Sequence, residues 1–418
     1  MIKRAVVGAT SLSYNSFVLR MKAHVPLEKR FTLAAIAALL LLCSFAQAQT
    51  TQSTTPRKID RPLNLLVLGD SISWGQGLKD EHKAWYLVKS WLRQNTGREV
   101  RERIEAHSGA VIGTPNQSEP PAFSDLDGEL GRAYPTVHGQ LDHALKMYAD
   151  PASVDLVIVD GCINDLDSRR LLNAANTPDG IRELAQAKCG PPVEELLTRI
   201  TNVFPNAHVV ITGYYAILSE KSANDFFMRA LAKRFYSPDA GAPKINDKTL
   251  RERLIAISRE WYHTSDQMLS AAARKVDAQL QAKGSHQRVL FAGAGFTPEH
   301  SFAANHSRLW GFDASALRKL LVLFTLGRVE LRANDERRSQ RGELCKAVLP
   351  PAASESPEQK MTREDRLIRC KLAAVGHPNR KGAAMYADAI GNLLKPLLAN
   401  SGWIKDASTA TTAITPQR

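Results

Sequence analysis

Residues 63–71 read LNLLVLGDS, and this stretch decides the fold that we expect. A short, mostly apolar run that ends at a glycine is typical of a strand buried on both faces. Residues 154–159 (VDLVIV), 208–212 (HVVIT) and 288–291 (RVLF) are further runs of this kind. Helix-like segments separate the runs, so the sequence predicts a mostly parallel sheet covered by helices on both faces, which is a three-layer α/β fold.

Periodic segments between these runs give the helices. Residues 82–96 repeat apolar side chains at helical spacing and stop at Gly97, a common helix end. Residues 248–281 predict one long helix or two, and residues 314–332 predict another. Residues 347–365 are rich in Pro, Ser and Glu, which predicts a mobile surface loop.

Composition along the chain predicts its organisation. We expect one folded domain over residues 62–400, with a helical insertion or cap at about 220–374. Residues 49–61 are rich in Thr, Gln and Ser and predict a flexible linker, and residues 401–418 predict a disordered tail. Residues 1–48 are interpreted as a leader and signal peptide.

The targeting prediction rests on one apolar run. Lys29 and Arg30 precede residues 31–45, which are mostly apolar, and residues 46–48 (AQA) match a cleavage site with small side chains. The run is shorter than the ~20 residues that a membrane span needs. We therefore expect a chain without an integral membrane span, exported to the periplasm or the medium after cleavage near Ala48.

Four cysteines remain after that cleavage, an even number in an oxidising compartment. Cys162, Cys189, Cys345 and Cys370 allow three pairings. The sequence-local choice joins Cys162 to Cys189 and Cys345 to Cys370, but spacing does not decide between the three. The chain has neither a metal-like CxxC spacing nor a phosphate-binding loop, so disulfides are favoured over zinc and no cofactor is expected.

The chain has a formal charge of +13, and residues 1–48 contain six basic residues and one acidic residue, so a chain without them keeps +8. A basic surface favours anionic partners such as acidic lipid headgroups or polysaccharide, although a solvated basic face is the simpler interpretation. Basic residues over 318–341, including Arg341, are mixed with acidic ones such as Asp335 and are not interleaved with stacking aromatics. This pattern argues against nucleic acid. Oligomeric state stays open.

Four blocks hold residues that are able to do chemistry. Ser71 follows the first strand, where a hydroxyl projects into the crevice above a parallel sheet. Gly109 offers a backbone N–H, and Asn164, after the strand over 154–159, offers an amide N–H to an oxyanion. His377 precedes a helical segment whose dipole disfavours imidazolium and keeps the ring able to accept a proton. Taken singly, each block is equally a turn or a helix cap.

In this order the blocks resemble the SGNH (GDSL-type) hydrolase family, which is named for its Ser, Gly, Asn and His. The resemblance spans roughly residues 63–400 and is loosest between 215 and 377. It implies a flavodoxin-like three-layer fold and ester hydrolysis through an acyl-enzyme. Ser71 would be the nucleophile and His377 its base. The resemblance also implies an oxyanion hole made of the Ser71 and Gly109 backbone N–H groups and the Asn164 side chain.

Two positions depart from the family pattern. Cys162 stands two residues before Asn164, where the family usually has Gly. Ala374 stands three residues before His377, where the family usually has an Asp that orients the histidine. Some members orient it with a backbone carbonyl instead, and we expect that arrangement here; a carboxylate from the 220–374 region is the alternative.

Three functions fit these residues. The first is a carboxylic-ester hydrolase of the lipase or esterase kind, acting on lipid or small acyl esters. The second is a carbohydrate O-acetyl esterase or acyltransferase, and the third is a catalytically silent binding protein on the same fold. A large apolar cleft would favour the first and a polar cleft the second. Candidate residues for the cleft wall, which core packing explains equally well, are Tyr214, Tyr215, Trp310 and Phe312.

Overall fold

The computed structural model describes residues 61–119, 128–238, 245–313, 332–398 and 403. The chain divides into two compact units, Met1–Arg57 and Lys58–Arg418, and every described residue lies in the second. Three predicted features therefore lie wholly or mostly outside the described residues: the signal peptide with most of the linker, nearly all of the helix at 314–332, and the tail except Trp403.

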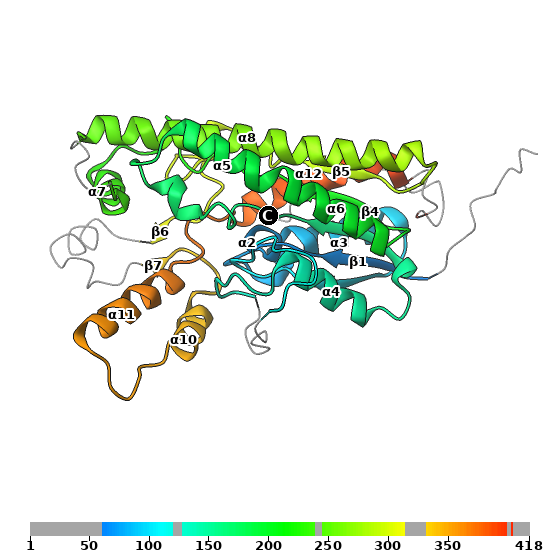
Figure 1. The fold of residues 1–418 in the computed structure, drawn as a ribbon, viewed down its shortest axis with the longest axis horizontal. Coiled ribbons are helices and arrows are strands. Elements are labelled where there is room, and N and C mark those ends of the chain that lie inside the picture. The colour runs from blue at the N-terminus through cyan, green and yellow to red at the C-terminus, as the bar shows by residue number, and fades with distance from the viewer. Residues whose placement is uncertain (1–60, 120–127, 239–244, 314–331, 399–402, 404–418) are drawn as a thin grey trace, which may run out of the picture. The chain divides into compact units, whose positions relative to one another are not determined.

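A five-stranded parallel sheet forms the centre of the molecule (Figure 1). Its strands lie in the order β2-β1-β3-β4-β5, which is the order of flavodoxin-like sheets. The α/β prediction is confirmed, and four of the strands coincide with the predicted runs. The bounds are β1 (Leu63–Val67), β2 (Val100–Ile104), β3 (Val154–Val159), β4 (His208–Thr212) and β5 (Val289–Ala292).

Helices cover both faces of this sheet (Figure 1). Alternate side chains of β1 point to opposite faces: Leu65 packs in the apolar cluster beneath α3 and α12, and Leu66 packs in the cluster beneath α4, α5, α6 and α8. The helices are α2 (Ser71–Trp74), α3 (Ala84–Thr96), α4 (Val137–Met147), α5 (Pro178–Cys189), α6 (Pro191–Val203), α7 (Phe226–Phe235), α8 (Asp247–Ala282), α10 (Arg338–Val348), α11 (Pro357–Lys371) and α12 (Arg380–Leu398).

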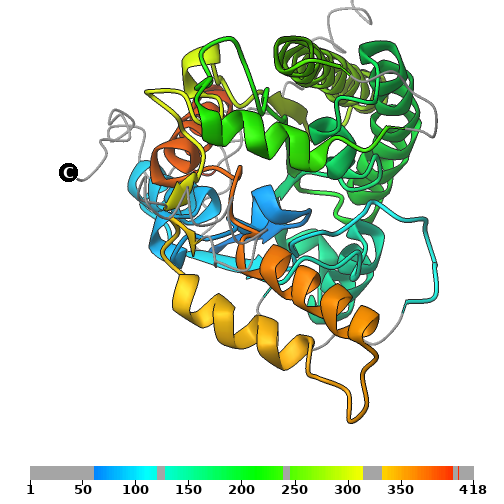
Figure 2. The same ribbon diagram turned by 90° about the vertical axis from the view of Figure 1, so that its left-hand side faces the viewer.

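Part of the segment 220–374 belongs to the sheet and its covering layers, and part of it lies outside them. It supplies β5 to the central sheet and α8, a single helix where one or two were expected, to one covering layer. Its other helices, α7, α10 and α11, lie to one side of the sheet (Figures 1 and 2). A short antiparallel pair, β6 (Phe312–Asp313) with β7 (Arg332–Ala333), also belongs to this segment.

The loop predicted over residues 347–365 is wrong for its second half. α11 begins at Pro357, directly after Ser356, whose hydroxyl accepts a hydrogen bond from the Gln359 N–H at 3.2 Å. The Gln359 side chain in turn accepts from the Ser356 N–H at 2.9 Å. This Ser-Pro-Glu-Gln run is a capping box with proline at the first helical position, a start signal that outweighs the polar composition.

Both disulfides follow the sequence-local pairing. Cys162–Cys189 ties the loop after β3 to the end of α5, and Cys345–Cys370 ties α10 to α11. Within the described ranges, no helix combines the length and apolar character needed to cross a membrane.

Candidate active site

The fold brings Ser71 and His377 together although 306 positions separate them in the sequence. Ser71 is the first residue of α2, directly after β1, and His377 lies just before α12. Ser71 Oγ and His377 Nε2 are 2.7 Å apart, within hydrogen-bonding distance. A serine hydroxyl that donates to a neutral imidazole is the pairing that general-base activation requires.

The turn that carries Ser71 is fixed by two buried carboxylates. Asp70 caps α2 by accepting from the Ile72 N–H at 2.8 Å, and it also accepts from the Tyr214 hydroxyl at 2.8 Å. Asp160, at the end of β3, accepts from the Asp70 N–H at 2.6 Å and the Ser73 N–H at 2.8 Å. Gly69 has φ 126°, and a Cβ there would lie 1.9 Å from Asp160 Oδ1, so only glycine fits.

Burial also sets the charge of this turn. It raises the pKa of Asp70 to about 6, against the lowering effect of the hydrogen bonds from Ile72 and Tyr214. Burial raises the pKa of Asp160 well above its usual value, and the neighbouring Asp70 adds to that rise. Two carboxyls this close and this buried resist ionising together, so one of them stays protonated at mildly acidic pH.

The His377 segment is held by backbone pairing. The Trp310 N–H donates to the His377 carbonyl at 2.7 Å, and the Gly376 N–H donates to the Trp310 carbonyl at 2.8 Å. The Tyr215 hydroxyl donates to the Gly376 carbonyl at 2.8 Å. These contacts fix the main chain on both sides of the histidine without using its ring.

Burial, together with the Arg341 guanidinium, lowers the pKa of His377 to about 4, although Glu129 and the carbonyls of Ala374 and Val375 act in the opposite direction. Nδ1 of the ring makes no hydrogen bond of ordinary geometry with any residue that the structure describes. The ring is therefore neutral over most of the pH range. Ala374 itself is fully buried.

Gly109 and Asn164 line the same pocket as Ser71 and His377. Gly109 has φ 82°, and a Cβ there would lie 2.5 Å from the backbone nitrogen of Arg132, so glycine is required. Asn164 Nδ2 donates one N–H to the Ala110 carbonyl at 2.9 Å. An amide nitrogen carries a second N–H, which suits it to donate to a group bound in the pocket.

The pocket is large and mostly apolar. It has a volume of about 420 Å³, within the range of small-molecule sites. Of the four candidate wall residues, Tyr214, Tyr215 and Phe312 line it, whereas Trp310 lies at a different surface depression. Further apolar lining residues come from α7, α8 and the segment before His377, among them Met228, Leu231, Phe235, Leu254, Leu372 and Val375.

Solved structures similar to this chain are lipases and esterases. An extracellular lipase from Streptomyces rimosus shares 16% identity over 59% of this chain and 87% of its own, with a TM-score of 0.36. Phospholipase A1 from Streptomyces albidoflavus NA297 shares 14% over 61% and 89%, with a TM-score of 0.38.

A carbohydrate acetylesterase from Sinorhizobium meliloti shares 17% identity over 56% of this chain and 84% of its own, with a TM-score of 0.27. No protein-family model matches the chain, and no curated protein matches it in sequence. Similarities this low carry no argument about activity, which depends on the site itself.

Cys162 takes a backbone conformation that favours glycine. Its φ is 113°, and its side chain is fully buried and bonded to Cys189. The family pattern has glycine at this position, so the departure in sequence leaves the backbone path glycine-like. A residue with a side chain stores strain there, and the disulfide to α5 helps to hold it.

Sequence reasoning missed a buried charge cluster beside the site. Arg341 of α10, which we interpreted as part of a solvated basic face, is fully buried between Glu129 and Asp335. Arg341 Nη1 lies 2.9 Å from Asp335 Oδ2, and Nη2 donates to Glu129. Burial raises the pKa of Asp335 to about 6, partly offset by Arg341. The solvated-face interpretation is wrong for Arg341 because its two carboxylates replace water.

This cluster connects α10 to the loops around Ser71. Glu129 accepts from the Trp74 ring N–H at 2.6 Å and from the Gly77 N–H at 2.8 Å, just after α2. The Glu129 carbonyl accepts from the Gln76 amide at 2.7 Å, and Gln76 accepts from the Ser108 hydroxyl, next to Gly109. The described residues contain no cluster of His, Cys, Asp or Glu suited to a metal ion.

Proposed function

We propose that this chain is an exported serine hydrolase that cleaves carboxylic esters of apolar acyl chains through an acyl-enzyme. The contact between Ser71 Oγ and His377 Nε2, 2.7 Å at the wall of a large apolar pocket, carries this proposal. The mostly apolar lining favours a lipid ester over a carbohydrate acetate, because acyl carbons find more partners there than sugar hydroxyls do.

In this mechanism Ser71 Oγ attacks the ester carbonyl while His377 Nε2 accepts the hydroxyl proton. His377 then returns the proton to the leaving alcohol, and a water molecule activated in the same way releases the acid. The Ser71 and Gly109 N–H groups and the Asn164 amide would stabilise the oxyanion, each donor supplying about 10²–10³ in rate.

The neutral state of His377 at working pH follows from its lowered pKa. We propose that the carbonyls of Ala374 and Val375, which raise the pKa of the ring, orient it through contacts looser than an ordinary hydrogen bond, in place of the Asp that Ala374 replaces. Export is supported by the two disulfides and by the apolar N-terminal run, because disulfides persist in oxidising compartments.

Labelling with a fluorophosphonate ester mimic, read by peptide mass spectrometry, tests the proposal. We expect an adduct on Ser71 that is absent in Ser71→Ala and falls at least about 100-fold in rate in His377→Ala, since the base activates the nucleophile. His306→Ala, at a surface depression apart from the pocket, is the matched control and should label normally. A folded wild-type chain without an adduct on Ser71 would exclude a serine hydrolase.

A further inference from the structure

Large apolar side chains are exposed chiefly on two helices. Among the described residues, the exposed large hydrophobic side chains are Met147, Phe226, Phe235 and Met361. Phe226 and Phe235 lie on α7, with exposed fractions of 59% and 40%, and Met361 lies on α11, with 66%. Only Met147, on α4, lies elsewhere. A concentration of this kind marks an interaction surface more often than scattered single residues do.

These two helices lie on one side of the molecule, at the left of Figure 1 and toward the viewer in Figure 2, where α7 is green and α11 orange. An ion pair of 3.8 Å between Arg234 and Asp365 links them. Both helices supply side chains to the wall of the pocket that contains Ser71, Phe235 from α7 and Arg369 from α11. Because Phe235 is also exposed, the pocket reaches the surface beside it.

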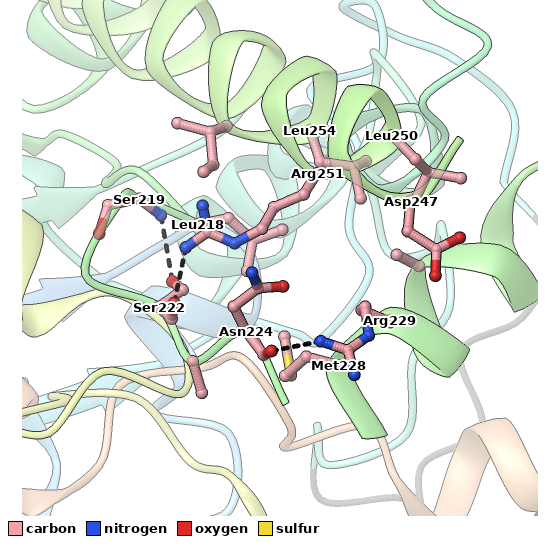
Figure 3. A pocket seen from close by; sticks show the side chains of 13 residues that line it. Leu218, Ser219, Ser222, Asn224, Met228, Arg229, Asp247, Leu250, Arg251 and Leu254 are labelled. Carbon is pink, nitrogen blue, oxygen red and sulfur yellow. Dashed lines mark hydrogen bonds between the residues drawn. The ribbon is translucent and has the colours of Figure 1, made fainter. Parts of the chain in front are cut away.

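Neither helix is packed like a core element. α7 buries only Phe227, and α11 buries none of its residues. A small cavity of about 30 Å³ remains between α7 and α8 (Figure 3), and it shares Met228 and Leu254 with the large pocket. Met228 and Leu231 of α7 pack against the core, whereas Phe226, Phe235 and Met361 keep much of their surface exposed in the part of the chain that the structure describes.

The two helices carry more basic than acidic residues. α7 has three basic residues and no acidic one, and α11 has five basic and three acidic residues. The three on α7 all have partners within the protein: Lys233 pairs with Asp247 at 2.8 Å, Arg234 pairs with Asp365 at 3.8 Å, and Arg229 donates to the Asn224 carbonyl at 2.7 Å. Exposed aromatic and aliphatic side chains among an excess of Lys and Arg suit the interface of an anionic lipid layer, where the apolar groups enter the headgroup region and the cations meet phosphates.

We propose that α7 and α11 form a lipid-binding surface that docks the pocket mouth onto an anionic phospholipid layer. Phe235 inserts at the mouth, and Phe226 and Met361 insert further along the same two helices, so that an acyl ester passes from the layer into the pocket without crossing water. The proposal rests on the proposed function for its consequence in catalysis, but the binding itself does not depend on Ser71 chemistry.

Flotation with vesicles of ether-linked phosphatidylglycerol and phosphatidylcholine in equal amounts tests the surface. Ether lipids lack the ester bond, so binding is measured without hydrolysis. We expect the full chain to float with these vesicles and to bind pure ether-linked phosphatidylcholine at least about tenfold more weakly, since the anionic headgroups supply part of the attraction.

The double variant Phe226→Ser with Met361→Ser should lose at least about tenfold in affinity for the mixed vesicles, because both apolar insertions are removed. Met147→Ser is the matched control, an exposed methionine on α4, and should bind as the wild type does. Unchanged binding of the double variant, or wild-type binding that Met147→Ser weakens equally, would overturn the proposal. So would concentration-dependent dimerisation abolished by Phe226→Ser without vesicle binding, which would make this face a contact between copies.

Hydrolysis of a short, water-soluble phenyl ester separates this proposal from the proposed function. If the chain binds vesicles but shows no Ser71-dependent hydrolysis, the lipid-binding surface is supported and the proposed esterase activity is excluded. If the chain hydrolyses the soluble ester but does not bind vesicles, the proposed function is supported and the lipid-binding surface is excluded.

Discussion

At the scale of single residues, the environment of His377 determines how the site responds to pH. Serine hydrolases with an Asp beside the histidine hold the imidazolium form by its charge, whereas here Ala374 offers none and Arg341 opposes a second positive charge. The pKa of His377 is therefore lowered to about 4 by burial and by this charge.

We predict that kcat/KM rises with pH through a midpoint near 4 and is level above about pH 5, because the neutral ring is the base and the lowered pKa keeps it neutral. Initial rates with a soluble ester across about pH 3–8 give the profile. A midpoint near the ordinary histidine value would contradict the prediction.

Asp70 needs its own control because burial raises the pKa of its carboxyl to about 6, within the same window. Asp70→Asn keeps an oxygen that can cap α2 and removes the titration. An inflection near pH 6 that vanishes in this variant belongs to Asp70 and not to His377, and the limb near pH 4 should stay.

At the scale of elements, the loop between β3 and α5 shows how a cysteine takes a glycine's place. Cys162 combines φ 113° with a bond to Cys189 at the end of α5. The bond holds the loop that presents Asn164, while the side chain strains the backbone.

Two disulfide-free variants separate these effects. Cys162→Gly with Cys189→Ala should be more stable than Cys162→Ala with Cys189→Ala by about 1 kcal/mol, because glycine removes the strain that alanine keeps. Both should fall below the wild type by ~2–4 kcal/mol from loss of the cross-link. Urea unfolding gives the three free energies, and an alanine pair at least as stable as the glycine pair would exclude strain at this position.

The same scale shows what sequence could predict. The runs at 63–68 and 154–159 gave strands correctly because buried parallel strands are continuous in apolar residues. Edge strand β2 (VRERI) is too charged to carry that signal. The polar composition of residues 347–365 predicts a loop, whereas the cap at Ser356 is a local signal for the start of α11. Ser71 and His377 are adjacent as predicted, and their roles stay predictions.

At the scale of the whole molecule, the Arg341 cluster could not be predicted, because its partners lie far apart in the sequence. Glu129 is 212 positions from Arg341, and no local pattern distinguishes a buried arginine from its exposed neighbours. The cluster joins α10 to the Glu129 loop and, through Gly77 and Trp74, to the turn that carries Ser71. We therefore expect α10 and the turn that carries Ser71 to unfold together.

We predict that Arg341→Met destabilises the protein by ~3–5 kcal/mol, since it leaves Glu129 and Asp335 buried without a counter-charge. Lys346→Met is the matched control on the same helix; its exposed pair with Glu343 should be worth at most ~1 kcal/mol. Adding Glu129→Gln and Asp335→Asn to Arg341→Met should recover part of the loss, because the uncompensated charges are gone. Urea unfolding measures each, and fluorophosphonate labelling of Ser71 under native conditions reports the turn. If Arg341→Met unfolds at the same urea concentration as Lys346→Met and labels at the wild-type rate, α10 and the catalytic turn are independent of each other.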